Sequence, residues 1–148
     1  MRIAIGSDHG GLPLKETALS TVRKLGHETL DLGTFTDESV DYPDFAEKVG
    51  QAIVEQRADR GIVICGSGVG ACIAANKIKG IYAAICHDTY SARQGVEHDN
   101  MNVLCLGGRV IGTELASELI RAFLSASFLN TGNYLRRAEK VKSLENRF

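Results

Sequence analysis

The chain has 148 residues, a length typical of one domain with a single hydrophobic core. Charged residues make up 24% of it and the formal net charge is −1, so the composition does not indicate a nucleic-acid partner. Its apolar runs are far shorter than the roughly 20 residues that cross a bilayer, and we expect no membrane partner. The first residues do not read as a signal peptide, which favours a cytoplasmic location.

The four cysteines are predicted to be reduced thiols, because no secretory signal accompanies them. None belongs to a CxxC pair and the four histidines are scattered along the chain, so no metal site is predicted. Three of the thiols, Cys72, Cys86 and Cys105, are interpreted as small packed hydrophobic residues.

Short runs rich in Ile, Val and Ala alternate with longer amphipathic segments, a pattern typical of strands and helices around a parallel sheet. Strands are predicted at residues 2–6, 27–32, 61–65, 81–86 and 103–106. Helices are predicted at 14–25, 43–53, 71–78 and 91–96, with a long one after Gly112. The sequence therefore predicts an α/β fold, a doubly wound five-stranded parallel sheet flanked by helices, with residues 1–148 in a single domain.

A charged segment at residues 134–146 closes the chain and is also predicted to be a helix. Leu135, Val141 and Leu144 form one apolar stripe on it. This segment is interpreted in two ways, as a solvated tail or as a helix that docks on a partner subunit.

Ligands of open α/β sheets bind beyond the carboxyl ends of the strands. Three polar segments are expected to lie there: residues 8–11 (DHGG), 65–70 (CGSGVG) and 97–100 (EHDN). In the first, Asp8 would orient a substrate hydroxyl or move a proton, and His9 would pair with a phosphate. The alternative for Asp8 is a cap on the next helix. In the third, His98 is suited to acid/base catalysis, and the alternative is a solvated surface residue.

The second segment has the most informative spacing. Cys65 ends a buried strand, glycines follow at every other position, and a helix begins after them. Such a loop lets several backbone N–H groups converge on one anion, either a phosphate or the oxyanion of an enediolate. The start of the helix would also stabilise a thiolate at Cys65, and Ser67 adds a hydroxyl. The alternative is that Cys65 only packs at the end of its strand.

A dinucleotide site is a further alternative for this loop. Gly66, Gly68 and Ala71 satisfy the fingerprint GxGxxG/A, and Asp88 lies near the position of a ribose-binding acid. The loop follows the third predicted strand rather than the first, however, and the chain has no room for a separate substrate domain. Dinucleotide binding is therefore the weaker interpretation.

The segments DHGG, ICGSGVGACIAANK and EHDNMNVLCLGGRVIG together resemble the type B ribose 5-phosphate isomerase family, which includes galactose 6-phosphate isomerase subunits. The pair Gly33-Thr34 and the triplet Asp41-Tyr42-Pro43 match the family too. The resemblance implies a Rossmann-like fold and a homodimer or homotetramer with active sites shared between subunits. It also implies a cofactor-free enzyme that interconverts ribose 5-phosphate and ribulose 5-phosphate.

Roles for individual residues follow from the resemblance. Cys65 matches the base that removes the proton next to the carbonyl, and His98 matches the group that opens the sugar ring. Asp8 matches a residue that handles substrate hydroxyls, and Ser67 stands where many members have threonine. The implied substrate-binding residues are the anion-binding Gly66, Gly68, Val69 and Gly70, the phosphate ligands His9, Arg109 and Arg137, and Asp99 and Asn100 beside His98.

Two departures from the family pattern concern the substrate. Asn133-Tyr134 stands where many members have an Arg-His pair, so one expected phosphate ligand is missing and Arg136 is expected to compensate. Asp99 replaces a common asparagine and brings negative charge near the substrate hydroxyls. Alternatives are therefore the same chemistry on a six-carbon aldose 6-phosphate or a four-carbon phosphate, and a non-catalytic module that binds a sugar phosphate or nucleotide.

Overall fold

The computed structural model describes residues 1–148, and a five-stranded parallel sheet forms its centre. The strands are β1 (Arg2–Ser7), β2 (Glu28–Asp31), β3 (Arg60–Cys65), β4 (Ala83–Ile85) and β5 (Val103–Gly107), in the order β2-β1-β3-β5-β4. All five predicted strands are confirmed. The largest difference is at β4, an edge strand that is shorter than the predicted 81–86.

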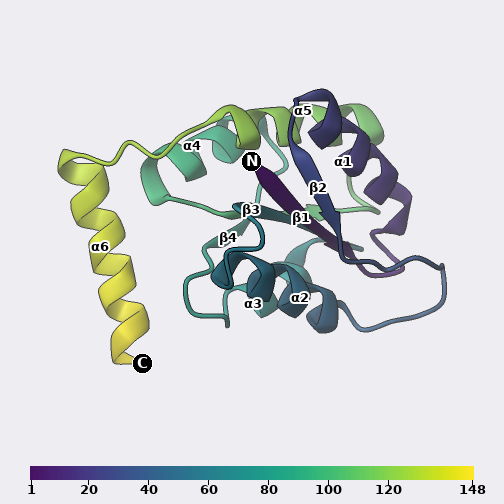
Figure 1. Cartoon of the computed structure of the whole chain (residues 1–148), viewed down its shortest axis with the longest axis horizontal. Coiled ribbons are helices and arrows are strands. Elements are labelled where there is room, and N and C mark those ends of the chain that lie inside the picture. Colours follow the sequence, from purple (N-terminus) through teal and green to yellow (C-terminus); the bar gives the residue numbers. More distant parts are fainter.

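Helices cover both faces of the sheet (Figure 1). On one face lie α1 (Leu12–Lys24), α4 (Thr89–Asp99) and α5 (Thr113–Ser125), and on the other lie α2 (Tyr42–Val54) and α3 (Val69–Ala75). A sixth helix, α6 (Gly132–Arg147), follows at the carboxyl end. This arrangement confirms the predicted doubly wound α/β fold.

Successive side chains of each strand point to opposite faces of the sheet, so the hydrophobic core is divided between the two faces. Ile62 and Ile64 of β3 pack with Phe123 of α5 on one side, while Val63 and Cys65 pack with α2 and α3 on the other. The Phe123 side chain has no exposed surface, and burial of a side chain of this size contributes about 2–3 kcal/mol to folding. Both faces of β3 are therefore buried, which fixes the position of the residues that follow it.

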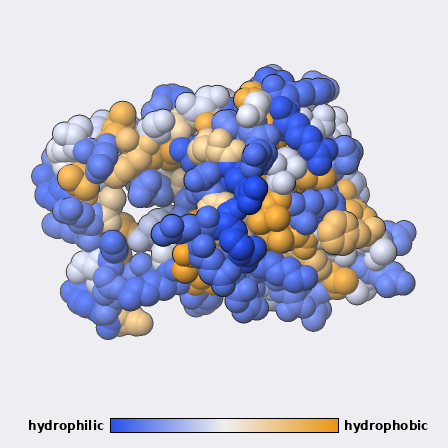
Figure 2. Space-filling view, viewed as in Figure 1, coloured by the Kyte–Doolittle hydropathy of each residue, from blue (hydrophilic) through white to orange (hydrophobic).

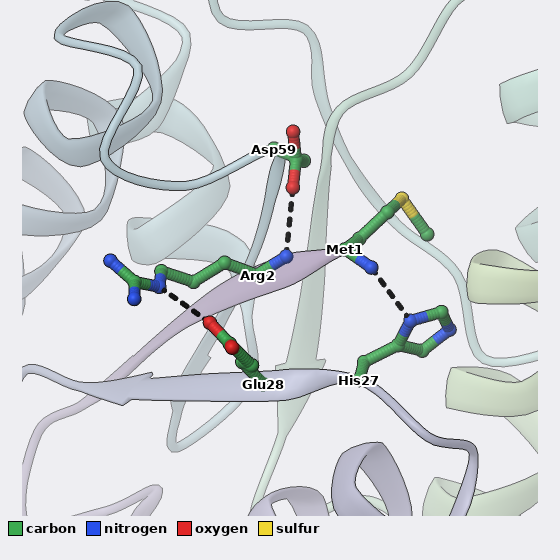
Figure 3. Close-up of polar contacts among 5 residues, drawn as sticks. All are labelled: Met1, Arg2, His27, Glu28 and Asp59. Atoms are coloured by element: carbon green, nitrogen blue, oxygen red, sulfur yellow. Dashed lines mark hydrogen bonds and ion pairs between the residues drawn. The ribbon is translucent and has the colours of Figure 1, made fainter.

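Polar contacts join the amino ends of the strands (Figure 3). The amino terminus of Met1 lies 3.1 Å from His27 Nδ1, and the Arg2 N–H donates to the Asp59 carboxylate at 2.7 Å. The exposed pair Arg2–Glu28, at 3.1 Å, contributes little because water screens it. Burial, followed by the charge of the amino terminus, lowers the pKa of His27 below its ordinary value.

The last helix stands apart from the sheet (Figure 1). None of its residues is buried. Tyr134 stacks on His98 of α4, and the Glu145 carboxylate accepts hydrogen bonds from the Gly80 N–H at 2.7 Å and the Tyr82 hydroxyl at 3.3 Å. Between these attachments a hollow of about 600 Å³ opens, visible in Figure 2. No helix of the structure is long and apolar enough to cross a bilayer.

Candidate active site

A cavity lies at the point where the strand order reverses, between the adjacent strands β1 and β3. Its volume of about 360 Å³ is in the range of small-molecule sites. The larger hollow beside α6 contains neither a thiol nor the glycine loop. Residues from the carboxyl ends of β1, β3 and β5 and from the start of α2 line the cavity: Asp8, Tyr42, Cys65, Gly66, Ser67, Gly70, Arg109 and Val110.

Glycines allow the three loops at this edge to approach one another. A Cβ on Gly10 would lie 3.1 Å from the Gly66 backbone nitrogen, and a Cβ on Gly108 would lie 2.5 Å from the Gly10 carbonyl oxygen. Only residues without a side chain fit at these contacts. The loops after β1, β3 and β5 therefore form one packed backbone layer beneath the cavity.

The Cys65 thiol lies at the tip of β3, with the residue only 4% exposed. The Gly68 N–H donates to its sulfur at 3.1 Å. Gly68 has a φ of +85°, a left-handed conformation that favours glycine, and it turns the chain into α3. The Gly68 turn therefore directs a backbone donor at the Cys65 sulfur.

Backbone amides beside the thiol remain available to a ligand. The N–H groups of Gly66, Ser67 and Gly70 donate to no group of the protein, and all three residues line the cavity. Ser67 Oγ accepts from the Val69 N–H at 3.2 Å, which leaves its hydroxyl proton free to donate. This set of donors is the arrangement that binds an anion.

Asp8 both caps a turn and lines the cavity. Its Oδ1 accepts a hydrogen bond from the Gly11 N–H at 2.9 Å, in the turn that leads into α1. The alternative in which Asp8 caps the next helix is wrong, because Gly11 is the N-cap of α1 and no side chain caps it; the carboxylate closes the turn before the helix instead. Asp88 caps α4 by accepting from the Ser91 N–H at 2.7 Å, a bond that lowers the pKa of its exposed carboxyl. Asp88 is therefore a helix cap rather than a ribose-binding acid.

Two basic residues, Arg109 and His9, follow the strands at the same edge of the sheet. The Arg109 side chain lies over Gly66, where a Cβ would be 3.2 Å from Arg109 Nη1, and it forms no ion pair. His9 accepts the Val40 N–H at Nδ1, at 3.2 Å. Arg109 lines the cavity and His9 does not, and that both residues face an anion stays a prediction.

The polar segment between β2 and α2 is held against this edge by a buried lysine. Lys15 Nζ donates to Asp31 at 3.1 Å and to the Thr34 carbonyl, and the residue is 7% exposed. Together with the bond from Val40 to His9, this ion pair fixes both sides of the segment. Lys15 was not predicted as a structural residue, because no local sequence pattern indicates that a lysine in α1 is buried.

Three further residues near the cavity were also missed as site residues. The Tyr42 ring packs on Gly70, where a Cβ would lie 2.6 Å from a ring carbon, and Val110 lines the opposite wall. His87 Nε2 accepts the Gly107 N–H at 3.1 Å, and burial lowers the pKa of His87. The available signal for Tyr42 was an aromatic residue before a proline at the start of a helix.

Comparison with known proteins identifies the family. The sequence model for ribose/galactose isomerases matches residues 3–141. This chain belongs to that family. The structure of ribose-5-phosphate isomerase B from Clostridium thermocellum superposes with a TM-score of 0.95, at 47% identity and with 99% of each chain covered.

Curated relatives agree with this assignment. Ribose-5-phosphate isomerase B of Escherichia coli is 41% identical over 99% of this chain and 97% of its own. D-erythrulose-4-phosphate isomerase of Pectobacterium atrosepticum is 42% identical over 99% of this chain and 96% of its own. The chain is therefore a sugar-phosphate isomerase, which confirms the resemblance, the fold and the prediction of an enzyme.

One expectation about this isomerase is wrong. Residues 97–100 do not lie beyond the carboxyl end of a strand, because they end α4 and precede β5. His98, Asp99 and Asn100 consequently sit at the amino edge of the sheet, outside the cavity that Cys65 lines. Arg136 and Arg137 lie exposed on α6, which contacts α4. The chain thus separates the predicted site residues into two groups.

The other three thiols of the isomerase differ from one another. Cys86 and Cys105 are buried as predicted, and burial raises the pKa of Cys86 to about 11. Cys72 packs against the core as predicted, but it is only partly buried. A hydrogen bond with the Cys105 thiol is the main cause that lowers the pKa of Cys72 to about 7.

Proposed function

We propose that the chain interconverts ribose 5-phosphate and ribulose 5-phosphate through an enediolate, with Cys65 as the carbon base. The observation that carries the proposal is a buried thiol in the same cavity as backbone amides that have no other partner. The name of the E. coli relative supports this five-carbon substrate.

The proposed chemistry moves one proton between neighbouring carbons. The Cys65 thiolate takes the proton from C2 of the open-chain aldose, and the electron pair moves onto the carbonyl oxygen at C1. Removal of such a weakly acidic proton is feasible only where donors already in place stabilise that oxyanion. The thiol then returns a proton to C1 while a proton passes from O2 to O1, which gives the ketose. The step is balanced without any redox partner.

The free amides of Gly66, Ser67 and Gly70 are the proposed donors to the oxyanion. Gly68 supports the thiolate through its N–H. Asp8, with one oxygen fixed by the turn, is proposed to hold the substrate hydroxyls and carry the proton between O2 and O1.

A phosphate at the far end of the substrate needs cationic or hydrogen-bond-donating partners. Arg109 and His9 are proposed to provide them from the same chain, with Arg136 and Arg137 of α6 from a second one. Binding of this remote group supplies the free energy that holds C1 and C2 against the sulfur.

We propose a homodimer, or a homotetramer built from it, in which α4 and α6 of one subunit complete the cavity of its partner. His98 lies outside the cavity of its own chain. Around that cavity, Val69 is 50%, Ile73 58% and Val110 59% exposed. Large apolar side chains that gather beside a site are typical of a protein–protein contact. The four free thiols support a cytoplasmic location for this assembly.

A second candidate keeps the chemistry and changes the sugar. The P. atrosepticum relative is named for a four-carbon phosphate. Asp99 and Asn133 of this chain both lie in the group of residues proposed to complete the site from the partner. A four-carbon or six-carbon substrate would therefore alter these contacts and leave Cys65 in its role.

Exchange with solvent deuterium tests the proposal. The protein is incubated in D2O with ribose 5-phosphate, D-erythrulose 4-phosphate or galactose 6-phosphate, and label at C1 and C2 is followed by NMR. Among the three sugar phosphates, we expect ribose 5-phosphate to give the highest kcat/KM and the most deuterium bound to carbon. Faster turnover of the four-carbon sugar would reassign the substrate. A rise in Tm with a sugar phosphate but no exchange would contradict catalysis and favour the binding module.

A further inference from the structure

The His98 side chain is held by two neighbours that the mechanism above does not use. Gln94 lies one turn earlier on α4, with its amide Nε2 2.8 Å from His98 Nδ1. Tyr134 of α6 stacks on the imidazole, with ring centroids 4.6 Å apart and an interplanar angle of 29°. The ring is thus fixed by one hydrogen bond at its edge and one contact on its face.

The hydrogen bond determines where the imidazole carries its proton. An amide nitrogen donates and does not accept, so Nδ1 of His98 must be the acceptor. A neutral imidazole with an accepting Nδ1 carries its proton on Nε2. No group of this chain bonds His98 Nε2. The ring therefore presents a donor to whatever approaches the corner between α4 and α6.

We propose that Gln94 and Tyr134 are positioning residues that keep His98 as a neutral hydrogen-bond donor from Nε2. This inference rests on the proposed function and on the ring-opening role that the family resemblance implies for His98. As the bond between C1 and the ring oxygen breaks, the electron pair moves onto that oxygen, where the Nε2–H stabilises it. The hydroxyl at C1 becomes the carbonyl, and its proton passes through water to the former ring oxygen.

The role of Tyr134 follows from the same geometry. The single hydrogen bond from Gln94 fixes one point of the imidazole and leaves the ring free to turn about it. A stacked partner from α6 restricts that rotation, which keeps Nε2 in one direction. The attachment also makes the placement of α6 and the orientation of His98 depend on each other.

The first test reads the tautomer directly and needs no substrate. Long-range 1H–15N NMR at pH about 8.5, where an ordinary histidine is neutral, reports which ring nitrogen carries the proton. The His98 signals are assigned by their loss in His98→Asn. We expect a protonated Nε2 and a bare Nδ1 in the wild type, and a mixture of tautomers in Gln94→Met, which keeps the side-chain length without the donor. A protonated Nδ1 in the wild type would overturn the proposal.

The second test separates ring opening from carbon chemistry. Ribulose 5-phosphate cannot close a five-membered ring, because its O5 carries the phosphate, so exchange of its C1 hydrogen requires no ring opening. We expect Gln94→Met and Tyr134→Ala to lower kcat/KM for ribose 5-phosphate about tenfold and to leave this exchange unchanged. Equal loss in both reactions, or no loss in either, would overturn the positioning role.

A matched control is available on the same helix. Arg93 pairs with Glu97 at 3.0 Å with the same spacing of four residues, and neither side chain forms a hydrogen bond with His98. Arg93→Met should change neither reaction. A wild-type protein that gives the expected tautomer but neither turnover nor exchange would refute the proposed function and not the assignment of the tautomer.

Discussion

The two groups of predicted site residues are built in different ways. Around Cys65 the chain uses backbone: packed glycine loops, an amide on the sulfur and three amides without partners. Between α4 and α6 it uses side chains, including Arg136 and Arg137 on a helix with no buried residue. The first region is fixed by the core of one chain, and the second is attached through a stacked ring and one carboxylate.

This difference has a physical consequence for catalysis. Amides already fixed by the fold stabilise developing charge without the entropy cost of ordering side chains, whereas each long arginine loses rotamer freedom when it binds. The region that would stabilise the transition state is therefore preorganised in one subunit. In the proposed dimer, the arginines of α6, which would complete the phosphate site, lie in the region left to be ordered by the partner.

Removal of the thiol should have the largest effect on the preorganised region. Cys65→Ala is expected to lower proton exchange about 10³-fold, in line with the loss of a general base, while ribose 5-phosphate still raises Tm. Cys72→Ala is the control, since Cys72 does not line the cavity. Similar exchange rates in the two variants would exclude Cys65 as the base.

Mixing two inactive variants tests whether the regions come from different subunits. Cys65→Ala and His98→Asn are unfolded and refolded together, and aldose turnover is measured. If the site is shared, half of the dimers are hybrids with one intact site, which restores about a quarter of wild-type activity. That recovery would be a gain of about a hundredfold over either parent. If Cys65 and His98 act within one chain, mixing restores nothing.

A glycine substitution tests whether backbone geometry carries function. Gly68 and Gly26 have nearly equal φ angles of +85° and +86°, so alanine at either should cost about 1–2 kcal/mol of stability. At Gly26 a Cβ meets nothing within 4 Å, whereas at Gly68 it lies 3.1 Å from the Leu106 carbonyl carbon. We expect only Gly68→Ala to lower kcat as well, by about tenfold. Equal kcat in both variants, measured beside urea denaturation, would contradict the role of the Gly68 turn.

The smallest expected effect lies at the opposite edge of the sheet. Because the pKa of His27 is lowered in the folded chain, the unfolded chain takes up a proton first as the pH falls below about 6.5. His27 therefore stabilises the fold above that pH and loses this contribution below it. Tm is measured for the wild type and for His27→Gln at about pH 7.5 and about pH 5.5. The decrease in Tm should be larger for the wild type. Equal decreases in Tm for the two proteins would exclude a contribution of His27 to the pH dependence of stability.

The sequence predicted most of the fold and six of the eight residues that line the cavity. Apolar runs marked the five strands, and the loop after Cys65 was identified because its glycines are adjacent in sequence. β4 is shorter than predicted since the Tyr82 N–H bonds the Asn102 side chain instead of a neighbouring strand. The contact of Tyr42 with Gly70 depends on tertiary packing, which no local pattern contains. The position of residues 97–100 was misjudged because a polar turn before a strand resembles one after it.

The partly exposed Cys72 determines how chemical labelling of this enzyme must be interpreted. Its pKa of about 7 makes close to half of the Cys72 thiol a thiolate at neutral pH. Cys65 is less accessible to a reagent, because only 4% of the residue is exposed. Iodoacetamide will therefore alkylate Cys72 before Cys65. Cys72 lies in α3, beside the proposed contact between subunits. Inactivation by such a reagent identifies the base only in a Cys72→Ala background.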